Sequence, residues 1–289
     1  MMKILMLGGT RFFGKHTVKQ LLDNGHQVTI ATRGTTPDSF GDSVDRLVVD
    51  RTDKASLAKA LQGKTFDVVC DTLAYCSEDI RCLLDVITPK RYVVVSTVSV
   101  YEQMGMDTRE EDYNAKDYPL QWYYRSDAPY GEVKRQAEAA LYQVYPDVNF
   151  AAVRFPFVIG EDDYTKRLHF YVEHVIKEMP MYVDNLGEQM SFIFAEDAAA
   201  FLVWLTEQEF YGSINGSNAG TVSLEQIIRY VEEKTGKKAI FRSGAEAGSY
   251  NGTMQYSINT ELAKQNGYIF PPLEKKIWKL VDYLISVYR

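Results

Sequence analysis

A tyrosine and a lysine four residues apart carry the most reactive pattern in the sequence. Tyr130 and Lys134 belong to the segment Tyr130-Gly-Glu-Val-Lys134, which begins a stretch with helical periodicity. Residues i and i+4 lie on one face of a helix, so the ammonium group would lie beside the phenol and favour its ionisation. A phenol with a pKa near ~10 is otherwise a poor base at neutral pH. The pattern predicts proton transfer at a substrate oxygen, and a surface helix with an extended lysine is the alternative.

A hydroxyl-rich strand end supplies a third chemical group. Ser96-Thr-Val-Ser99 closes an apolar stretch that precedes the Tyr130 helix in the chain. In a doubly wound sheet, such a strand end and the start of the later helix face one crevice. We expect Thr97 to hydrogen-bond the same substrate oxygen as Tyr130, and Ser96 and Ser99 are the alternatives for this role.

A glycine-rich turn follows the first predicted strand. In Gly8-Gly-Thr-Arg-Phe-Phe-Gly14, free backbone amides and the helix dipole can bind a nucleotide pyrophosphate. Gly8 would make the tight bend and Gly14 would allow close helix–sheet packing, but Arg11 replaces the usual central glycine. The arginine either covers dinucleotide phosphates, which we favour, or marks a fold that has lost its dinucleotide. The predicted cofactor-binding residues of the turn are Gly8, Thr10, Arg11, Phe12, Phe13 and Gly14.

Residues at the ends of the second and third predicted strands indicate which dinucleotide the site would bind. Arg33 lies where NAD enzymes commonly place an acidic residue against the ribose hydroxyls. A guanidinium suits a 2′-phosphate better, because it makes charge-assisted bidentate bonds. We therefore expect NADP to be favoured over NAD, and a solvated loop arginine is the alternative. Asp50 is a predicted acceptor for the adenine amino group or a cap of the next helix, and Arg51 is a further predicted cofactor contact.

Alternating strands and helices must position these groups. Repeated units of this length require crossover helices over a parallel sheet, so the sequence predicts an α/β fold, a Rossmann doubly wound sheet with a smaller C-terminal α/β lobe. Residues 1–160 are assigned to the NAD(P)-binding domain, to which 186–217 return, and 161–289 mainly to a substrate-binding lobe. The connection at 102–129 exceeds ordinary loop length and predicts a functional or partly structured insertion. Strands are expected at 3–7, 28–31, 46–50, 66–71, 91–96 and 149–155, and helices at 13–24, 54–62, 78–86, 130–144, 166–177, 196–206, 224–235 and 273–288.

Composition narrows the classes of partner. The chain has 289 residues, 46% of them hydrophobic, which suffices for a large core. A net charge of −7 argues against a polyanion, so we expect a small-molecule substrate rather than nucleic acid. No stretch approaches the roughly 18 uninterrupted apolar residues of a membrane span. The spacing of the three cysteines, Cys70, Cys76 and Cys82, matches no zinc site, and a disulfide between any two of them would leave one thiol unpaired. Both features favour a reduced, cytoplasmic setting. His169 and His174 are five apart and do not share a helix face, so no metal site is expected.

Five segments in order resemble the extended short-chain dehydrogenase/reductase superfamily, and within it the NAD(P)-dependent epimerase/dehydratase family. They are GGTRFFG, STVSVY, YGEVK, RFPFVIG and FIFAEDAAAFL. The resemblance implies that Tyr130 is the general acid/base, that Lys134 binds the nicotinamide ribose and lowers the tyrosine pKa, and that Thr97 is their hydroxyl partner. It implies a structural role for Asp197. It also suggests a homodimer formed through helices of the sheet layer, including the helix at Tyr130.

Departures from the family pattern limit the predicted chemistry. Family dehydratases often carry Asp-Glu after the threonine, whereas Val98-Ser99 stands here, so a sugar-nucleotide dehydratase is disfavoured. The asparagine that is usual at the R-F-x-N junction is also absent, so a nucleotide-sugar substrate is neither favoured nor excluded. The sequence thus predicts an NAD(P)-dependent oxidoreductase or epimerase. Because the Arg11 turn resembles isoflavone-reductase-like and chloroplast stem-loop-binding proteins, the alternative is a catalytically silent protein that binds RNA or senses redox state.

Overall fold

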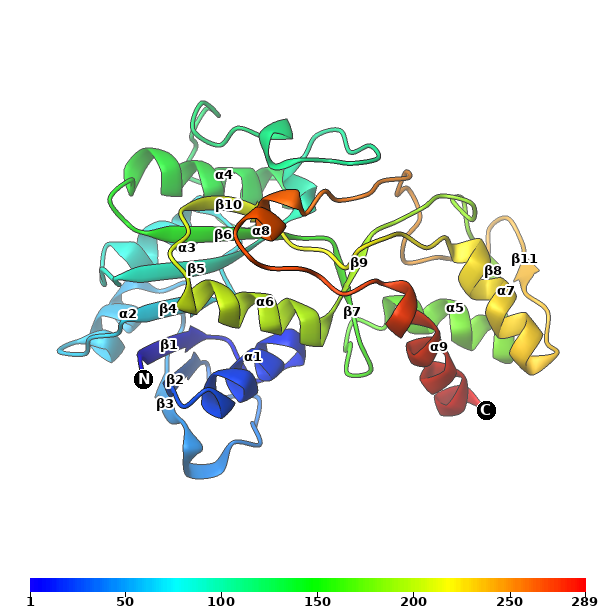
Figure 1. Ribbon diagram of the computed structural model, residues 1–289, viewed down its shortest axis with the longest axis horizontal. Coiled ribbons are helices and arrows are strands. Elements are labelled where there is room, and N and C mark those ends of the chain that lie inside the picture. Colours follow the sequence, from blue (N-terminus) through cyan, green and yellow to red (C-terminus); the bar gives the residue numbers. More distant parts are fainter.

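A parallel sheet of seven strands forms the centre of the computed structural model, which describes all 289 residues (Figure 1). The strand order is β10-β6-β5-β4-β1-β2-β3, so the direction of winding reverses between β1 and β4. At this switch point the loops after the two strands diverge and leave a crevice at their carboxyl ends. The predicted doubly wound α/β fold is confirmed. The strands are β1 (Lys3–Leu7), β2 (Gln27–Thr32), β3 (Asp45–Val48), β4 (Val68–Asp71), β5 (Arg91–Thr97), β6 (Phe150–Phe155) and β10 (Gly212–Asn215).

Helices cover both faces of this sheet. On one face, α1 (Phe12–Asp23) packs against α6 (Ala195–Glu207), and side chains of both join the strands in a buried cluster. On the other face, α2 (Lys54–Leu61), α3 (Ser77–Leu84) and α4 (Tyr130–Val144) share a second cluster with the strands. The central strands β1, β4, β5 and β6 are buried on both sides because each side meets a helix layer, whereas the edge strand β3 is mostly exposed.

A smaller lobe holds its own core at the other end of the molecule (Figure 1). Its helices are α5 (Arg167–Ile176), α7 (Leu224–Thr235) and α9 (Glu274–Tyr288), with the short strands β8 (Pro180–Tyr182), β11 (Ile240–Phe241) and β12 (Glu246–Ala247). A parallel pair, β7 (Phe157–Ile159) and β9 (Phe192–Phe194), joins the lobes. After β9 the chain returns through α6 and β10 to the large sheet, and the five-residue α8 (Glu261–Gln265) lies beside β10.

The connection between β5 and α4 lies along two helices of its own chain. It contains the single turns η2 (Val98–Val100) and η3 (Glu110–Asp112). Ser77 Oγ on α3 donates to the Gln121 carbonyl at 2.7 Å, and Gln136 Nε2 on α4 donates to the Pro119 carbonyl at 3.1 Å. Every residue of α4 from position 131 to 142 is buried or half-buried. The helix that the family resemblance assigns to a dimer contact thus packs against the sheet, α3 and the connection.

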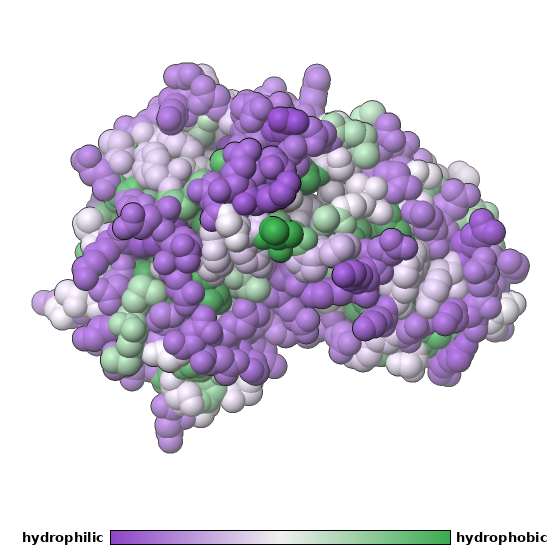
Figure 2. All heavy atoms as spheres, viewed as in Figure 1, coloured by the Kyte–Doolittle hydropathy of each residue, from purple (hydrophilic) through white to green (hydrophobic).

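Hydrophilic residues dominate the face of the molecule in Figure 2, where hydrophobic residues form small, separate spots. None of the helices combines the length and the apolar character that crossing a membrane requires.

Candidate cofactor and substrate site

Two cavities adjoin at the switch point of the sheet. The smaller, of about 480 Å³, lies over the glycine turn and the ends of β2 and β3. The larger, of about 970 Å³, lies between the end of β5, the start of α4 and the smaller lobe. Together they form one site that extends from the sheet to the second lobe. The residues that line both are Phe12, Phe13, Thr72, Tyr75 and Tyr164.

Backbone geometry in the glycine turn agrees with the roles predicted for its glycines. Gly8 and Gly9 have φ values of 101° and 94°, a region that other residues rarely adopt. A Cβ on Gly8 would overlap Thr72 Oγ1, and one on Gly14 would lie 3.1 Å from the Gly9 nitrogen. The turn therefore forms an uncovered backbone cradle at the start of α1, as pyrophosphate binding requires.

Two arginines without carboxylate partners line the smaller cavity. Arg11 precedes α1, and its guanidinium carbon lies 5.7 Å from the centroid of the Tyr164 ring. Arg33 follows β2, is exposed, and forms no ion pair. Two free guanidinium groups beside an open glycine cradle are suited to the phosphates of a dinucleotide.

Asp50 lies in the same cavity and does not cap α2. Its Oδ1 accepts hydrogen bonds from Thr52 Oγ1 at 2.7 Å and Thr52 N at 2.9 Å, and these bonds lower the pKa of the Asp50 carboxyl. Asp53 is the cap, because its side chain accepts from the Ala55 nitrogen at 2.9 Å. The alternative of Asp50 as a helix cap is wrong, and its other carboxylate oxygen remains free to accept a bond.

Arg51 lines the cavity, but its charged group points away from it. The side chain is 5% exposed, and its guanidinium pairs with Asp71 and, at 3.0 Å, with Asp79. Burial opposes the charge, but the two carboxylates outweigh burial and raise the pKa of Arg51. The guanidinium therefore joins the ends of β3 and β4 beneath the cavity, contrary to the expected cofactor contact through this group.

Lys134 is the most deeply buried cation of the larger cavity. It is 4% exposed, and its Nζ donates to the carbonyls of Ala74 at 2.7 Å and Val95 at 2.9 Å. Nζ lies 5.9 Å from the centroid of the Tyr130 ring and 4.9 Å from that of Tyr75. Burial lowers the pKa of Lys134 to about 8. Two backbone carbonyls and two aromatic rings thus hold the ammonium at the junction of the cavities.

Tyr130 stands beside Thr97 because α4 begins very close to β5. A Cβ on Gly131 would overlap the Ser99 carbonyl, so only glycine permits this approach. Although Tyr130 is 47% exposed, the cleft walls withdraw water from its phenol and raise the pKa of Tyr130, while Thr97 and Arg167 act in the opposite direction. This direction differs from the predicted lowering by Lys134, whose ammonium is directed at carbonyls. The phenol is protonated and suited to donate a proton.

Of the three hydroxyls at the end of β5, Thr97 is positioned best for the predicted role. Its Oγ1 accepts from the Ser99 nitrogen at 3.2 Å and donates to Ser99 Oγ at 3.3 Å. Ser96 instead donates to Glu138 at 2.5 Å and is committed to that bond. The structure thus brings Thr97, Tyr130 and Lys134 to one cavity.

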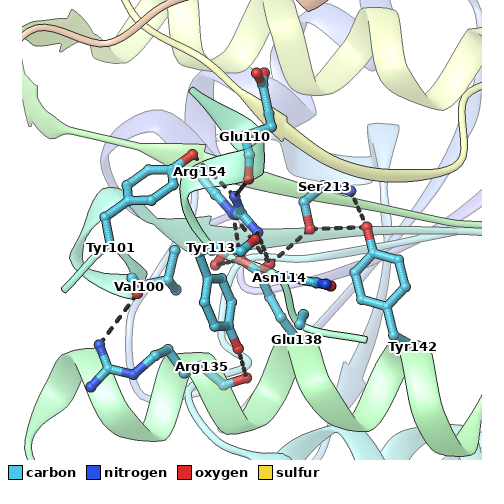
Figure 3. Close-up of polar contacts among 12 residues, drawn as sticks. Val100, Tyr101, Glu110, Tyr113, Asn114, Arg135, Glu138, Tyr142, Arg154 and Ser213 are labelled. Atoms are coloured by element: carbon cyan, nitrogen blue, oxygen red, sulfur yellow. Dashed lines mark hydrogen bonds and ion pairs between the residues drawn. The ribbon is translucent and has the colours of Figure 1, made fainter. Parts of the chain in front are cut away.

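A buried polar network that the sequence analysis did not identify supports α4 (Figure 3). Arg154 on β6 is 1% exposed and forms an ion pair with Glu138 on α4, with Nη2 and Oε2 2.7 Å apart. Arg154 also donates to Tyr101 Oη at 3.1 Å, to the Glu110 carbonyl at 2.8 Å and to the Tyr113 carbonyl at 3.3 Å. Its guanidinium therefore joins the sheet, α4 and the connection.

Glu138 fixes the end of β5 against α4. Besides Arg154, the carboxylate accepts from Ser96 Oγ and, at 2.7 Å, from Ser213 Oγ on β10. Ser96 precedes Thr97, and Glu138 lies one helical turn beyond Lys134, so this carboxylate connects the two elements that carry the candidate catalytic groups. The sequence analysis could have noticed Glu138 because it follows Lys134 by four residues, which places the two side chains on one face of the helix.

Other predicted groups lie outside both cavities. Asp197 accepts from Lys276 at 2.5 Å and from Asn218 at 2.8 Å, which joins α6 to α9 in a structural role. His169 bonds to Tyr288 at 2.9 Å, and His174 bonds to the Phe170 carbonyl. No group of three or more His, Cys, Asp or Glu side chains is arranged to hold a metal ion.

The buried lysine gives the stability of the protein a specific pH dependence. The native pKa of Lys134 is about 8, whereas an unfolded lysine keeps its proton to roughly 10.4. Between these values the unfolded state binds more protons than the native state, so the contribution of Lys134 to stability rises with pH. We expect the unfolding free energy of the wild type, relative to Lys134→Met, to increase by roughly 1–3 kcal/mol from about pH 7.5 to about pH 10.

Denaturant unfolding at each pH measures this difference. Lys64→Met, which changes an exposed lysine, is the matched control and should show no comparable trend. A difference between wild type and Lys134→Met that stays constant across this range would contradict the lowered pKa of Lys134.

Comparison with known proteins identifies the family. A family model described as NAD(P)H-binding matches residues 8–178, more than half of the chain, including the glycine turn and the Tyr130 helix. The chain belongs to this NAD(P)H-binding family. The ordered motifs resemble those of the extended short-chain dehydrogenase/reductase superfamily, and the fold agrees with this resemblance.

Relatives of this NAD(P)H-binding protein carry different names. The chloroplast stem-loop binding protein of 41 kDa b from Arabidopsis thaliana is 27% identical over 204 residues, which span 65% of this chain but only half of that protein's length. CDP-abequose synthase from Salmonella muenchen is 20% identical, and the alignment covers 97% of this chain and 97% of that protein. The solved UDP-glucose 4-epimerase of Thermus thermophilus in complex with NAD is 18% identical, with a TM-score of 0.74 over 98% of this chain and 99% of that one. This last likeness shows the fold.

Proposed function

We propose that this protein is an NAD(P)-dependent oxidoreductase or epimerase that transfers a hydride at a carbinol or carbonyl carbon of a small molecule. The observation that carries the proposal is the junction of the two cavities. Thr97, Tyr130 and Lys134 line the larger cavity directly beside the glycine cradle that suits a dinucleotide. The nicotinamide would supply the hydride chemistry, and the protein the alignment and proton transfer.

The three residues have distinct proposed roles. Thr97 Oγ1 orients the substrate oxygen by a hydrogen bond. Tyr130, protonated in this environment, donates its phenolic proton to a carbonyl oxygen during reduction and becomes a phenolate. In the reverse, oxidative direction that phenolate accepts the proton of the substrate hydroxyl. Lys134, fixed by the Ala74 and Val95 carbonyls, keeps a positive charge next to the phenol and the cofactor ribose. Phe12 and Phe157 add apolar surface to the wall of the cavity in which this step takes place.

The charge of the larger cavity favours an anionic substrate. Arg167, at the start of α5, has no ion-pair partner, and its guanidinium carbon lies 5.7 Å from the centroid of the Phe157 ring. Glu102 is the single carboxylate among the lining residues. A nucleotide sugar would place its phosphates against Arg167, in line with the names of CDP-abequose synthase and UDP-glucose 4-epimerase.

Identification of retained and converted ligands tests the function. Mass spectrometry of the purified protein should reveal a bound nicotinamide dinucleotide, and incubation with a panel of nucleotide sugars should show epimerisation or redox conversion of at least one. A protein that binds neither NADPH nor NADH would contradict the proposal.

We propose a preference for NADP that depends on Arg33. Because Arg33 is free of carboxylate partners, its guanidinium can form charge-assisted bonds to a 2′-phosphate. Arg33→Ala should weaken NADPH binding roughly 10- to 100-fold and leave NADH binding nearly unchanged. Titrations followed by protein fluorescence measure both affinities. Arg229→Ala, which removes an exposed arginine of α7, is the control, and tighter binding of NADH than NADPH by the wild type would refute the preference.

A second candidate function is RNA binding on the same fold. It is favoured by the match to the chloroplast stem-loop binding protein and opposed by the net charge of −7. RNA affinity that falls steeply with salt, together with no turnover on any nucleotide sugar, would replace the proposed enzyme with this function.

A further inference from the structure

We propose that Arg125, from the connection between β5 and α4, binds a phosphate of the dinucleotide. The inference rests on the proposed occupation of the smaller cavity by a nicotinamide dinucleotide. Arg125 lines this cavity opposite the glycine turn, although it lies more than 110 residues after that turn in the chain. No motif of the sequence pointed to this residue.

The guanidinium of Arg125 is held on one side and free on the other. Its Nη2 donates to the Leu73 carbonyl at 2.8 Å, and its Nε donates to Asp79 Oδ2 at 3.1 Å. Its carbon lies 4.5 Å from the centroid of the Tyr75 ring. Nη1 has no protein partner, and 40% of the side chain is exposed. An arginine fixed in this way loses little freedom when its remaining donors bind a phosphate.

The surrounding charges favour an anion at this point. Asp79 is shared between Arg125 and the buried Arg51, so it neutralises Arg125 only in part. Arg33 and Arg125 line the cavity together with Asp50, and after the hydrogen bonds from Thr52 both cations help to lower the pKa of Asp50. Asp50 is the only acidic residue that lines the cavity, against three arginines, Arg11, Arg33 and Arg125, whose charge is not neutralised by two buried carboxylates as that of Arg51 is. The cavity therefore retains positive charge for a ligand that carries several phosphates.

Tyr75 connects this arginine to the candidate catalytic group. The ring lines both cavities and meets the Tyr130 ring edge-on, with centroids 6.0 Å apart. The nitrogen of Tyr75 also donates to Asp79 at 2.7 Å, so Asp79 fixes Tyr75 and Arg125 together. A phosphate bound by Arg125 would therefore stabilise the wall against which Tyr130 packs.

The phosphate has two possible sources in the dinucleotide, the pyrophosphate and the 2′-phosphate of NADP. Binding of four ligands, NADPH, NADH, ADP and adenosine 2′,5′-bisphosphate, separates them, because NADH and ADP carry the pyrophosphate without a 2′-phosphate, and the bisphosphate carries the 2′-phosphate with only the adenosine-side phosphate of the pyrophosphate. Calorimetry on wild type and Arg125→Gln measures these affinities at low salt. A pyrophosphate contact should weaken NADPH, NADH and ADP, and also the bisphosphate if the contact is to the adenosine-side phosphate, whereas a 2′-phosphate contact should weaken NADPH and the bisphosphate alone. Either loss should be roughly 10- to 100-fold.

Arg81→Gln is the matched control. Arg81 also stacks a guanidinium on an aromatic ring of the connection, at 4.5 Å from the Trp122 centroid, and also pairs with an acidic residue, Glu78, but it lines neither cavity. The affinities of the Arg81→Gln variant for the four ligands should stay within about threefold of wild type. Should Arg125→Gln fold poorly, Arg125→Lys retains the charge without the fork and should lose part of the affinity.

The outcomes for the inference and for the proposed function are distinct. Unchanged affinity for all four ligands in a folded Arg125→Gln protein, with wild type binding normally, overturns the role of Arg125 alone. Failure of the wild type to bind any of the four ligands overturns the proposed dinucleotide function instead.

Discussion

Replacing Arg154 with methionine is expected to lower the free energy of unfolding by about 3–5 kcal/mol. The substitution puts an unbranched apolar side chain in place of the arginine but leaves the Glu138 carboxylate, which is 1% exposed, without its counter-ion. It also removes donors to Tyr101, Glu110 and Tyr113, whose oxygens lie in the same interior. The cost exceeds that of an ordinary polar substitution because a buried charge loses its compensation. Chemical denaturation of the wild type and the variant measures this loss in the free energy of unfolding.

Two further variants separate this explanation from a general loss of packing. Arg154→Met combined with Glu138→Gln removes the charge as well as its partner and should recover part of the lost stability. Arg229→Met breaks an exposed pair with Glu233, in which the arginine side chain is 77% exposed, and should cost about 0.5 kcal/mol or less. Equal losses for Arg154→Met and Arg229→Met would contradict the role assigned to the network.

Replacing Tyr130 with phenylalanine is expected to reduce turnover roughly 10²- to 10⁴-fold. The change removes only the hydroxyl that donates or accepts the proton, because the ring can keep its contact with Tyr75. The affinity for NADPH should remain within about threefold of wild type, since the glycine turn and the arginines are untouched. The rate is followed on the nucleotide sugar that the substrate panel identifies.

Tyr124→Phe is the control for this experiment. Tyr124 is 61% exposed and lines neither cavity, so its variant should retain full turnover. Undiminished turnover in Tyr130→Phe, with the protein folded and NADPH bound, would exclude Tyr130 as the proton donor.

The fold was predictable because its signals are local. In the strand predicted at residues 3–7, every residue after Lys3 is apolar, as burial on both faces requires, and the structure has β1 at the same positions with those four residues buried. The helix predicted at 224–235 has those bounds in the structure, where Ser223 and Gln226 cap its start and Gly236 ends it with a φ of 71°. Helical and strand periodicities, and the freedom of glycine, act over a few residues and can be read in order along the chain.

The candidate site was predictable only where a motif stands next to a predicted strand or helix end. Gly8, Gly14, Thr97 and Tyr130 line the cavities for this reason. The raised pKa of Tyr130 differs from the predicted lowering by Lys134, and the Arg51 guanidinium forms ion pairs with Asp71 and Asp79, because both depend on what surrounds a side chain in space. Desolvation in the cleft raises the phenol pKa, and Asp71 and Asp79 attract the guanidinium from a different strand end.

By itself the sequence determined the order of strands and helices, the glycine turn and the tyrosine–lysine pair, because each depends on neighbours within about one helical turn. The tertiary structure alone decided which groups meet. Arg154 and Glu138 are 16 residues apart, and Lys134 and Ala74 are 60 apart, yet each pair is in direct contact. Such partners follow from the convergence of several strand ends at one edge of the sheet, which brings distant side chains within hydrogen-bond distance and withdraws water from them.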